Sequence, residues 1–321
     1  MPLEAITETY AGKVGEVTLG ATAAEGGTRA STVTVGGEQS LPFLHFEAPT
    51  PNRPAIAMEV WDMAPTDWPE VVMAPFADVA ADPAAWAAKC EKEYGADLIC
   101  LRLLSTHPDS GDTSPAQAVD TVKAVLKATG VPLIIWGCGQ ANKDNEVMPA
   151  VSQAAKGERC LLGSAVQDNY KTLAAAAMAD GHLIIGESPL DINIEKQVNI
   201  LLSDTGFPLE RIVIFPTTGA LGYGLEYAYS IMERTRLAAL AGDRSISQPI
   251  LAVVGWEAWR AKEAKATQEE QPRWGPEGER GPGWEAATGA GFLQAGADIL
   301  VMRHPAAAAA VRAHIDALMK A

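Results

Sequence analysis

The sequence is poor in cysteine and has no closely spaced cysteine pair. Four cysteines occur among 321 residues, and no two form a C-x-x-C arrangement. Iron–sulfur clusters and structural zinc sites depend on closely spaced thiolates, so the sequence argues against either in this chain. Cys90 lies in a helix pattern and Cys100 and Cys160 in strand patterns, where small buried thiols are expected. Cys138 lies at the end of a strand pattern, and its role stays open.

Basic charge and long apolar runs are also scarce. Lys and Arg number 25 against 40 Asp and Glu, which gives a net charge of −15. Such a surface repels phosphate backbones, so nucleic acid is not an expected partner. No segment reaches the roughly 18 apolar residues of a membrane span, and Met1–Tyr10 lacks the basic start of a signal peptide. We therefore expect a cytoplasmic protein with no membrane partner.

What the chain does contain is a regular alternation of strand and helix patterns. Eight short apolar runs predict buried parallel strands, and they are Ala55–Met63, Asp97–Leu104, Pro132–Gly139, Cys160–Val166, His182–Glu187, Ile212–Thr218, Pro249–Trp256 and Asp298–Arg303. The Ala-rich segments between and after them predict helices, namely Asp82–Tyr94, Ser114–Ala128, Asp144–Lys156, Asp168–Ala179, Ile192–Thr205, Leu221–Ala241, Glu285–Gln294 and Pro305–Lys320. Eight such units predict an α/β fold, the closed (β/α)8 TIM barrel, whose chemistry lies at the carboxyl ends of the strands. An open doubly wound sheet is disfavoured, because the first run is not followed by G-x-G-x-x-G.

Residues 1–54 have a different pattern. Val14–Leu19 and Ser31–Val35 alternate polar and apolar residues around a turn signal at Glu25–Gly27, which predicts an antiparallel β-hairpin. Four prolines between 42 and 54 then predict a stiff, extended lead-in. We therefore predict a division into an N-terminal hairpin extension, 1–54, and the barrel, 55–321.

One connection is much longer than the others. Glu257–Gly283 separates the seventh strand from its helix and carries Trp259 and Trp274, with Trp256 before it and Trp284 after it. Long loops in compact barrels are functional or disordered, and indoles favour burial against a partner or ligand. We predict an ordered contact loop that packs against a partner or a ligand.

The predicted strand ends bring polar and aromatic side chains to one face but form no catalytic motif. His107 and His304 have no partner at metal-ligand spacing, and neither a phosphate-binding loop nor a nucleophile elbow occurs. Glu59, Asp62 and Glu187 fit either acid–base groups or hydrogen-bond acceptors for loop amides, and both interpretations stay open. We predict no catalytic residue and no metal ligand, and a broad apolar and amide-rich surface that covers a large flat ligand or another protein. The glycine-rich loop Thr217–Gly224 would let the backbone approach such a group closely.

Several stretches resemble one known family. They are Pro54–Asp62, reading PAIAMEVWD, after a hairpin that ends in Val33–Glu38, reading VTVGGE, and then Leu41–Phe43; a second set is Gly222–Tyr227, reading GYGLEY, and Tyr229–Arg236, reading YSIMERTR. From about Val14 to the last helix, the chain resembles the small subunit of the corrinoid iron–sulfur protein of the acetyl-CoA (Wood–Ljungdahl) pathway.

That resemblance implies a heterodimer in which a large subunit carries cobalamin and a [4Fe–4S] cluster, while this chain is a barrel similar to methyltetrahydrofolate methyltransferases. It implies that cobalamin is shared at the carboxyl-end face of the barrel, with no iron–sulfur cluster in this chain. It also implies transient contacts with methyltetrahydrofolate methyltransferase and acetyl-CoA synthase as the methyl group passes between them. No D-x-H-x-x-G occurs, so this chain is not expected to hold a cobalamin domain of its own.

The individual corrin contacts are inferred from the strand ends, because the family motifs do not specify them. The predicted cofactor-binding residues are Asp62, Arg102, Cys138, Gly139, Gln140, Asn142, Gln167, Asn169, Glu187, Thr217, Thr218, Gly222, Tyr223, Gly224, Trp256 and Arg303. The favoured hypothesis is a non-catalytic subunit that caps cobalamin and shields its reduced cobalt.

Two alternatives belong to other classes. A stand-alone pterin-dependent methyltransferase would bind the pterin through Asp62, Asn142, Asp191 or Asn193. A barrel hydrolase or aldolase would use Glu187, but no lysine stands within a predicted strand to form a Schiff base.

Overall fold

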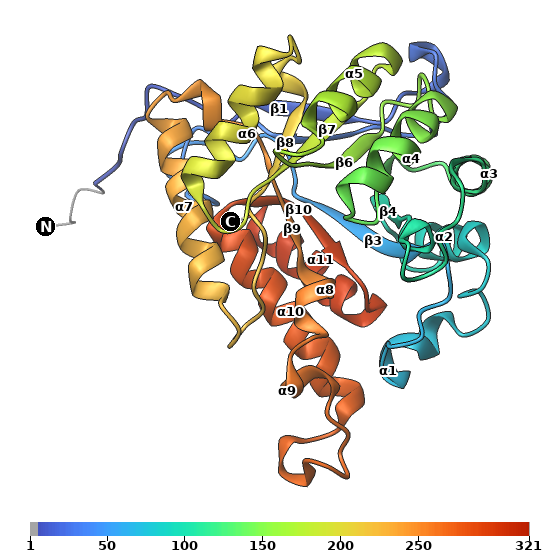
Figure 1. Ribbon diagram of the computed structural model, residues 1–321. Helices are drawn as coiled ribbons and strands as arrows, with labels where there is room; N and C mark the ends of the chain where they lie inside the picture. The colour runs from blue at the N-terminus through green and yellow to red at the C-terminus, as the bar shows by residue number, and fades with distance from the viewer. Residues whose placement is uncertain (1–5, 321) are drawn as a thin grey trace, which may run out of the picture.

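Eight parallel strands close into a barrel in the computed structural model, which describes residues 6–320 (Figure 1). In chain order they are β3 (Ala55–Trp61), β4 (Leu98–Arg102), β5 (Leu133–Trp136), β6 (Leu161–Ala165), β7 (Leu183–Glu187), β8 (Ile212–Phe215), β9 (Ile250–Val253) and β10 (Ala297–Met302). Strand β10 pairs with both β9 and β3, which closes the sheet. Each predicted apolar run is a strand, so the predicted TIM barrel is confirmed. The segment Met1–Tyr10, on which the absence of a signal peptide was predicted, lies partly outside the described residues.

Helices cover the outside of the barrel. The long ones are α2 (Pro83–Lys92), α3 (Pro115–Ala128), α4 (Ala141–Ala154), α5 (Tyr170–Asp180), α6 (Ile192–Asp204), α7 (Leu225–Leu240), α10 (Glu277–Ala295) and α11 (Pro305–Leu318). Three short helices are α1 (Glu70–Met73), α8 (Val254–Ala258) and α9 (Lys262–Lys265). No helix within residues 6–320 is both long enough and apolar enough to cross a bilayer.

Three helix starts differ from the sequence prediction by three residues or more. Helix α4 begins at Ala141, three residues early, because the Gln140 side chain accepts a hydrogen bond from the Lys143 amide at 2.7 Å and caps the helix. Helix α7 begins only at Leu225, because Gly224 is left-handed, with φ of 99°. Helix α10 begins at Glu277, well before the predicted Glu285, and packs Gly281 so closely against Trp259 that a Cβ would clash. Local capping and tertiary packing thus set these boundaries.

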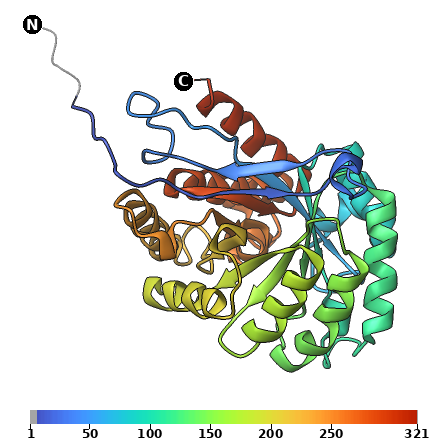
Figure 2. The ribbon, with the colours of Figure 1, turned by 90° about the horizontal axis from the view of Figure 1, so that it is seen from above.

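The N-terminal hairpin lies across the amino end of the barrel (Figure 2). It pairs β1 (Glu16–Leu19) with β2 (Val33–Gly36), as predicted. The Gly15 amide donates to Ser247 O just before β9, and the Gly20 amide donates to Arg159 O just before β6. Val17, Leu19 and Val35 pack against the inward-facing side chains of the barrel. The hairpin therefore closes one end and leaves the carboxyl end as the accessible face.

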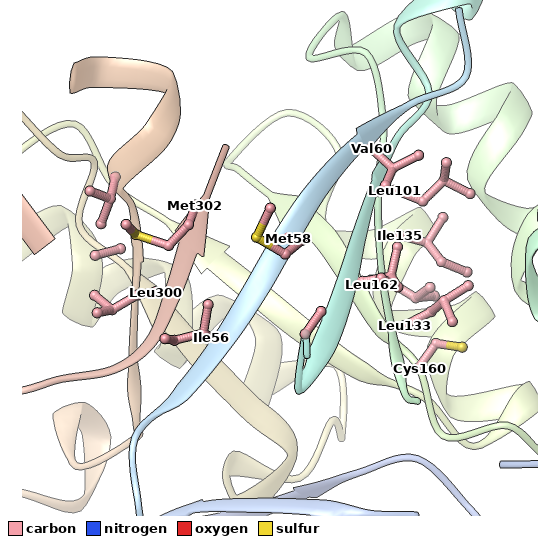
Figure 3. Close-up of a cluster of buried hydrophobic side chains, with 14 of the residues drawn as sticks. Ile56, Met58, Val60, Leu101, Leu133, Ile135, Cys160, Leu162, Leu300 and Met302 are labelled. Carbon is pink, nitrogen blue, oxygen red and sulfur yellow. The ribbon is translucent and has the colours of Figure 1, made fainter. Parts of the chain in front are cut away.

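Alternate residues of each strand face the helices and form the larger core. Figure 3 shows part of this layer, including Met58 from β3, Leu101 from β4 and Met302 from β10. Cys90, Cys100 and Cys160 are buried as predicted, and burial raises the pKa of Cys100 and Cys160 to about 12. These thiols are inert packing groups.

Candidate functional site

Arginine and tryptophan side chains alternate at the carboxyl end of the barrel, which we call the mouth. The Arg102 guanidinium, at the end of β4, lies 4.7 Å from the ring centroid of Trp136 and 4.8 Å from that of Trp256. The Arg303 guanidinium, just after β10, lies 4.9 Å from Trp256 and 4.6 Å from Trp68. Cations over indole faces are attracted by the ring quadrupole. We call these groups, together with Trp61, the arginine–tryptophan stack.

A buried carboxylate, Glu59 of β3, supports the stack from below. Arg303 donates to both of its oxygens, from Nε at 2.9 Å and from Nη2 at 3.2 Å, and the Trp61 indole N–H donates at 2.7 Å. Burial would raise the pKa of Glu59, but the charges of Arg303 and Arg102 outweigh it and hold this pKa below the ordinary value. Glu59 is therefore ionised and committed to the stack, which fits hydrogen bonding rather than acid–base work.

A hollow of about 250 Å³ opens beside the stack. Six of the predicted cofactor-binding residues line it, namely Arg102, Gly139, Asn169, Glu187, Thr217 and Trp256. Its lining also includes Ser164, Asp144 and Phe215, which the sequence analysis missed. A serine inside the otherwise apolar strand β6 was the one available signal.

Glu187 is a carboxylate of the hollow with a single hydrogen-bond donor among the described residues. It ends β7 and accepts a hydrogen bond from Ser164 Oγ at its Oε2 atom. Asp144, by contrast, accepts from the Cys138 amide at 2.9 Å and from the Gly139 amide at 3.0 Å. Burial nevertheless raises the pKa of Asp144 above its ordinary value. Asp144 shapes the loop after β5, whereas Glu187 has capacity left for a ligand.

Two other lining residues brace the loops around the hollow. Asn169 accepts from the Val166 amide at 2.8 Å and donates to Ser164 O at 2.9 Å. Thr217 donates to Ser188 O at 2.6 Å. The side-chain hydrogen bonds of both residues are made within the protein, so these residues define the shape of the hollow and do not bind a ligand through hydrogen bonds.

The ten other predicted residues lie outside the lining of the hollow. Asp62 accepts from the Ser105 amide at 2.8 Å and from Ser105 Oγ at 2.5 Å, and burial raises its pKa. Thr218 is buried and donates to Val253 O at 3.0 Å. The remaining eight include the capping residue Gln140, the half-buried Cys138, the exposed Asn142 and Gln167, and Arg303 of the stack; Gly222, Tyr223 and Gly224 complete them.

The glycine-rich loop after β8 faces a neighbouring segment of the chain. The Leu221 amide donates to Thr288 Oγ1 of α10 at 3.3 Å, and the Tyr223 hydroxyl accepts from the Lys262 amide at 3.4 Å. The Tyr223 and Leu225 amides donate to Ala220 O. The Leu221, Tyr223 and Leu225 amides are thus used within the protein.

Residues 254–276, which we call the insert, replace the predicted long loop. The insert holds α8, α9 and a short 3-10 turn at Pro272–Trp274, and it projects beyond the barrel at the bottom of Figure 1. Glu285 of α10 ties it to the mouth by accepting from Trp259 Nε1 and the Arg303 amide, both at 2.6 Å, and from the His304 amide at 3.0 Å. Burial raises the pKa of Glu285 to about 7.

The tryptophans are less open than the sequence analysis expected. Five of the eight are buried in this chain, namely Trp61, Trp68, Trp86, Trp136 and Trp259. Trp86 belongs to α2 and packs against Phe76 and, edge to face, against Trp68 of the stack. Trp256 is the half-buried indole of the stack, and Trp274 on the insert is 39% exposed. The mouth therefore offers the edges of a packed stack instead of a bare aromatic platform. Among residues 6–320, no group of three or more His, Cys, Asp or Glu side chains is placed to hold a metal ion.

The architecture is a closed (β/α)8 barrel, and solved dihydropteroate synthases share this fold. The Xanthomonas albilineans dihydropteroate synthase with 4-aminobenzoic acid matches 84% of this chain and 94% of its own, with a TM-score of 0.55 and 18% identity. The Coxiella burnetii dihydropteroate synthase in complex with pteroic acid gives a TM-score of 0.56 at 14% identity, covering 84% and 95% of the two chains. At such identities the likeness is one of fold.

Sequence comparison is more specific. The family model described as CO dehydrogenase/acetyl-CoA synthase delta subunit matches residues 16–313. The acetyl-CoA decarbonylase/synthase complex subunit delta of Archaeoglobus fulgidus is 44% identical over 314 residues, covering 96% of this chain and 69% of that protein. Its counterpart in Methanosarcina mazei is 40% identical over 308 residues, covering 94% and 70%. The chain belongs to the CO dehydrogenase/acetyl-CoA synthase delta subunit family, the small subunits of corrinoid iron–sulfur proteins, which confirms the predicted resemblance.

Proposed function

We propose that this chain uses its mouth to cap a corrinoid carried by a partner subunit. Family membership supports the corrinoid as the relevant cofactor. The observation that carries the proposal is the size of the hollow, about 250 Å³, beside a packed arginine–tryptophan stack. Sites that bury a drug-sized ligand measure about 300–1,000 Å³. A corrinoid is larger than such a ligand, so it fits across the mouth and not inside it.

The residues at the mouth fit such a cofactor. Arg102 Nε is buried without an acceptor among the described residues, and Glu187 has an unused carboxylate oxygen. Together with Trp256, which is half-buried at the rim, they would hold the edge of the corrinoid. When bound, the corrinoid supplies the cobalt centre that accepts and releases the methyl group. The chain's own task is to exclude water and oxidants from that face, since the stack is closely packed and presents little free polar surface.

The alternative of a stand-alone pterin-dependent methyltransferase has less support at the residues proposed for it. Asp62 is engaged by Ser105, and Asp191 accepts from the Asn193 and Ile194 amides as the cap of α6. Asn142 and Asn193 are exposed. None of the four lines the hollow.

The partner that we propose is the large corrinoid and [4Fe–4S] subunit, in a cytoplasmic heterodimer. The relatives are described as delta subunits of an acetyl-CoA decarbonylase/synthase complex, which supports assembly with other subunits. Transient contacts with a methyltetrahydrofolate methyltransferase and with acetyl-CoA synthase complete the proposal. The projecting insert, with its exposed Trp274, is the natural place for one of them.

The test compares the corrinoid-bearing subunit with and without this chain. The cobalt is reduced with titanium(III) citrate, and its reoxidation in air-equilibrated buffer is followed by absorbance. We expect this chain to slow reoxidation by about tenfold or more, equivalent to about 1.4 kcal/mol of protection. Equal rates would contradict capping. Tight binding of methyltetrahydrofolate by the isolated chain, with methylation of free cobalamin, would instead establish the methyltransferase.

A further inference from the structure

The Arg102 guanidinium packs against two indoles. Its central carbon lies 4.7 Å from the ring centroid of Trp136 and 4.8 Å from that of Trp256. No side-chain hydrogen bond joins Arg102 to another residue between 6 and 320, and its Nε is buried without an acceptor. Arg102 lines the hollow, and none of its guanidinium N–H groups has an acceptor among the described residues. Because an unpartnered N–H carries a free-energy cost, a ligand group that accepts from Arg102 would relieve it.

Glu187 supplies the complementary group at the same hollow. It ends β7, three strands away from Arg102 on β4, so the two approach the hollow from different sides of the closed barrel. Ser164 Oγ donates to one oxygen, Oε2, and within the described residues nothing donates to Oε1. The hollow thus presents unused donors on one side and an unused acceptor on another.

The charges at the hollow argue against an anion as its ligand. Glu187, Asp144 and Glu257 all line it, against Arg102 as the one cation of the lining. The charge of Arg102 is also shared with the buried Glu59, whose pKa it lowers. A phosphate or carboxylate would meet more negative than positive charge. A neutral group that accepts from Arg102 and donates to Glu187 satisfies both without that repulsion.

We propose that the hollow is a subsite for one carboxamide arm of the corrinoid, with its carbonyl oxygen toward Arg102 and its N–H2 toward Glu187. This rests on the capping function proposed above and assigns the part of the cofactor that this chain recognises. The volume of about 250 Å³ suits a short arm and excludes the ring. A reduced pterin carries the same planar pairing of carbonyl and N–H, so the test includes one.

The experiment titrates the full chain with dicyanocobinamide, whose arms are carboxamides, and with its separated monocarboxylic isomers, each with one arm hydrolysed. Tryptophan fluorescence reports binding, because Trp136 and Trp256 flank the site. All isomers have the same net charge, so general repulsion affects them equally. We expect one isomer to bind about tenfold or more weakly than dicyanocobinamide, while the others stay within about threefold.

Variants identify the residue responsible. In Glu187→Gln the sensitive isomer should recover to within about threefold of dicyanocobinamide, because glutamine donates to a carboxylate and does not repel it. Asp62→Asn is the matched control. It alters another strand-end carboxylate, which Ser105 already satisfies outside the hollow, and should retain the full discrimination.

Each other outcome overturns the inference. If all isomers bind with the same affinity, the chain does not recognise an individual arm. If the sensitive isomer still binds weakly to Glu187→Gln, Glu187 does not contact that arm. If Glu187→Gln and Asp62→Asn change the binding of the isomers equally, the effect comes from the net charge of the protein and not from a contact with Glu187. Binding of tetrahydropterin that is lost in Glu187→Gln, with corrinoid binding unchanged, assigns the hollow to a pterin. If the reoxidation test succeeds but millimolar dicyanocobinamide does not bind, this inference fails while capping stands.

Discussion

Arginine side chains pack at both ends of the barrel, but they are held in opposite ways. At the amino end, Arg29 donates to Glu158 at 2.8 Å and to the carbonyls of Thr129 at 2.8 Å and Leu126 at 2.6 Å. At the mouth, Arg102 has no such partner and is held by two indoles. A guanidinium with all its donors occupied fastens segments together. One whose faces are packed and whose edge is empty is arranged for a ligand.

Arg303 stands between these extremes and shows how the mouth is kept rigid. Its donors go to Glu59 and its faces to Trp68 and Trp256. It therefore fixes Trp256, which in turn covers one face of Arg102. At the amino end, Arg29 stabilises the fold. At the mouth, Arg303 and Trp256 are held rigidly and position Arg102, whose donors have no acceptor among the described residues.

The largest effect expected from breaking this comparison is at the amino end. Arg29→Ala would leave Glu158 buried without its cation and remove the five hydrogen bonds that the Arg29 side chain donates. We expect the free energy of unfolding to fall by about 3–5 kcal/mol, measured by urea denaturation. Corrinoid capping, measured on the protein that stays folded, should be unchanged. A loss below about 1 kcal/mol would show that the amino-end arginine is not structural.

The next effect is pH dependence at the mouth. Burial raises the pKa of Glu285 to about 7, so between the unfolded value and 7 the folded state holds a proton that the unfolded state has lost. The stabilisation is complete below about pH 4.5 and is lost as the pH rises through 7. Between pH 5 and pH 8 the titration of Glu285 should make the free energy of unfolding fall by about 1–3 kcal/mol. In Glu285→Gln this part of the fall should be absent, because glutamine does not titrate. Urea titrations at these pH values check this, and parallel curves for the two proteins would contradict it.

A smaller effect compares two tryptophans of the carboxyl side. Trp256→Ala removes the indole that covers Arg102 and Arg303. We expect protection of the reduced cobalt to fall about tenfold, equivalent to about 1.4 kcal/mol. Trp274→Ala is the control, since this indole stacks on Lys262 and Arg280 within or beside the insert and is partly exposed. Equal losses in both variants would place the cofactor contact on the insert as well.

Much of the fold follows from the sequence because its signals are local. The run Leu133–Trp136 is apolar at every position, as a strand covered on both faces requires. The strand-end rule then placed Arg102, Glu187 and Trp256 correctly around one hollow. The rule also predicted Gly222–Gly224 at this site, but these residues do not line the hollow. Their loop packs against the insert and α10 instead.

The pairing of side chains at the mouth lies beyond such local signals. Arg102 packs against indoles from β5 and from α8, and Glu285 contacts Arg303 from a helix that starts well before its predicted position. These contacts depend on barrel closure and on the packing of the insert. Periodicity along the chain carries no information about either.

The smallest expected change in stability tests the comparison most directly. Arg102→Lys keeps a cation for Glu59 and for the two indole faces, so the free energy of unfolding should change by less than about 1 kcal/mol. Lysine lacks the planar fork of donors, however, so dicyanocobinamide should bind about tenfold more weakly. Urea denaturation and fluorescence titration of the same preparation separate the two quantities. If stability falls by several kcal/mol while affinity holds, Arg102 is a structural residue like Arg29. The arginines at the two ends of the barrel would then both be structural, because the unpaired donors of Arg102 would reflect imperfect packing and not a ligand site.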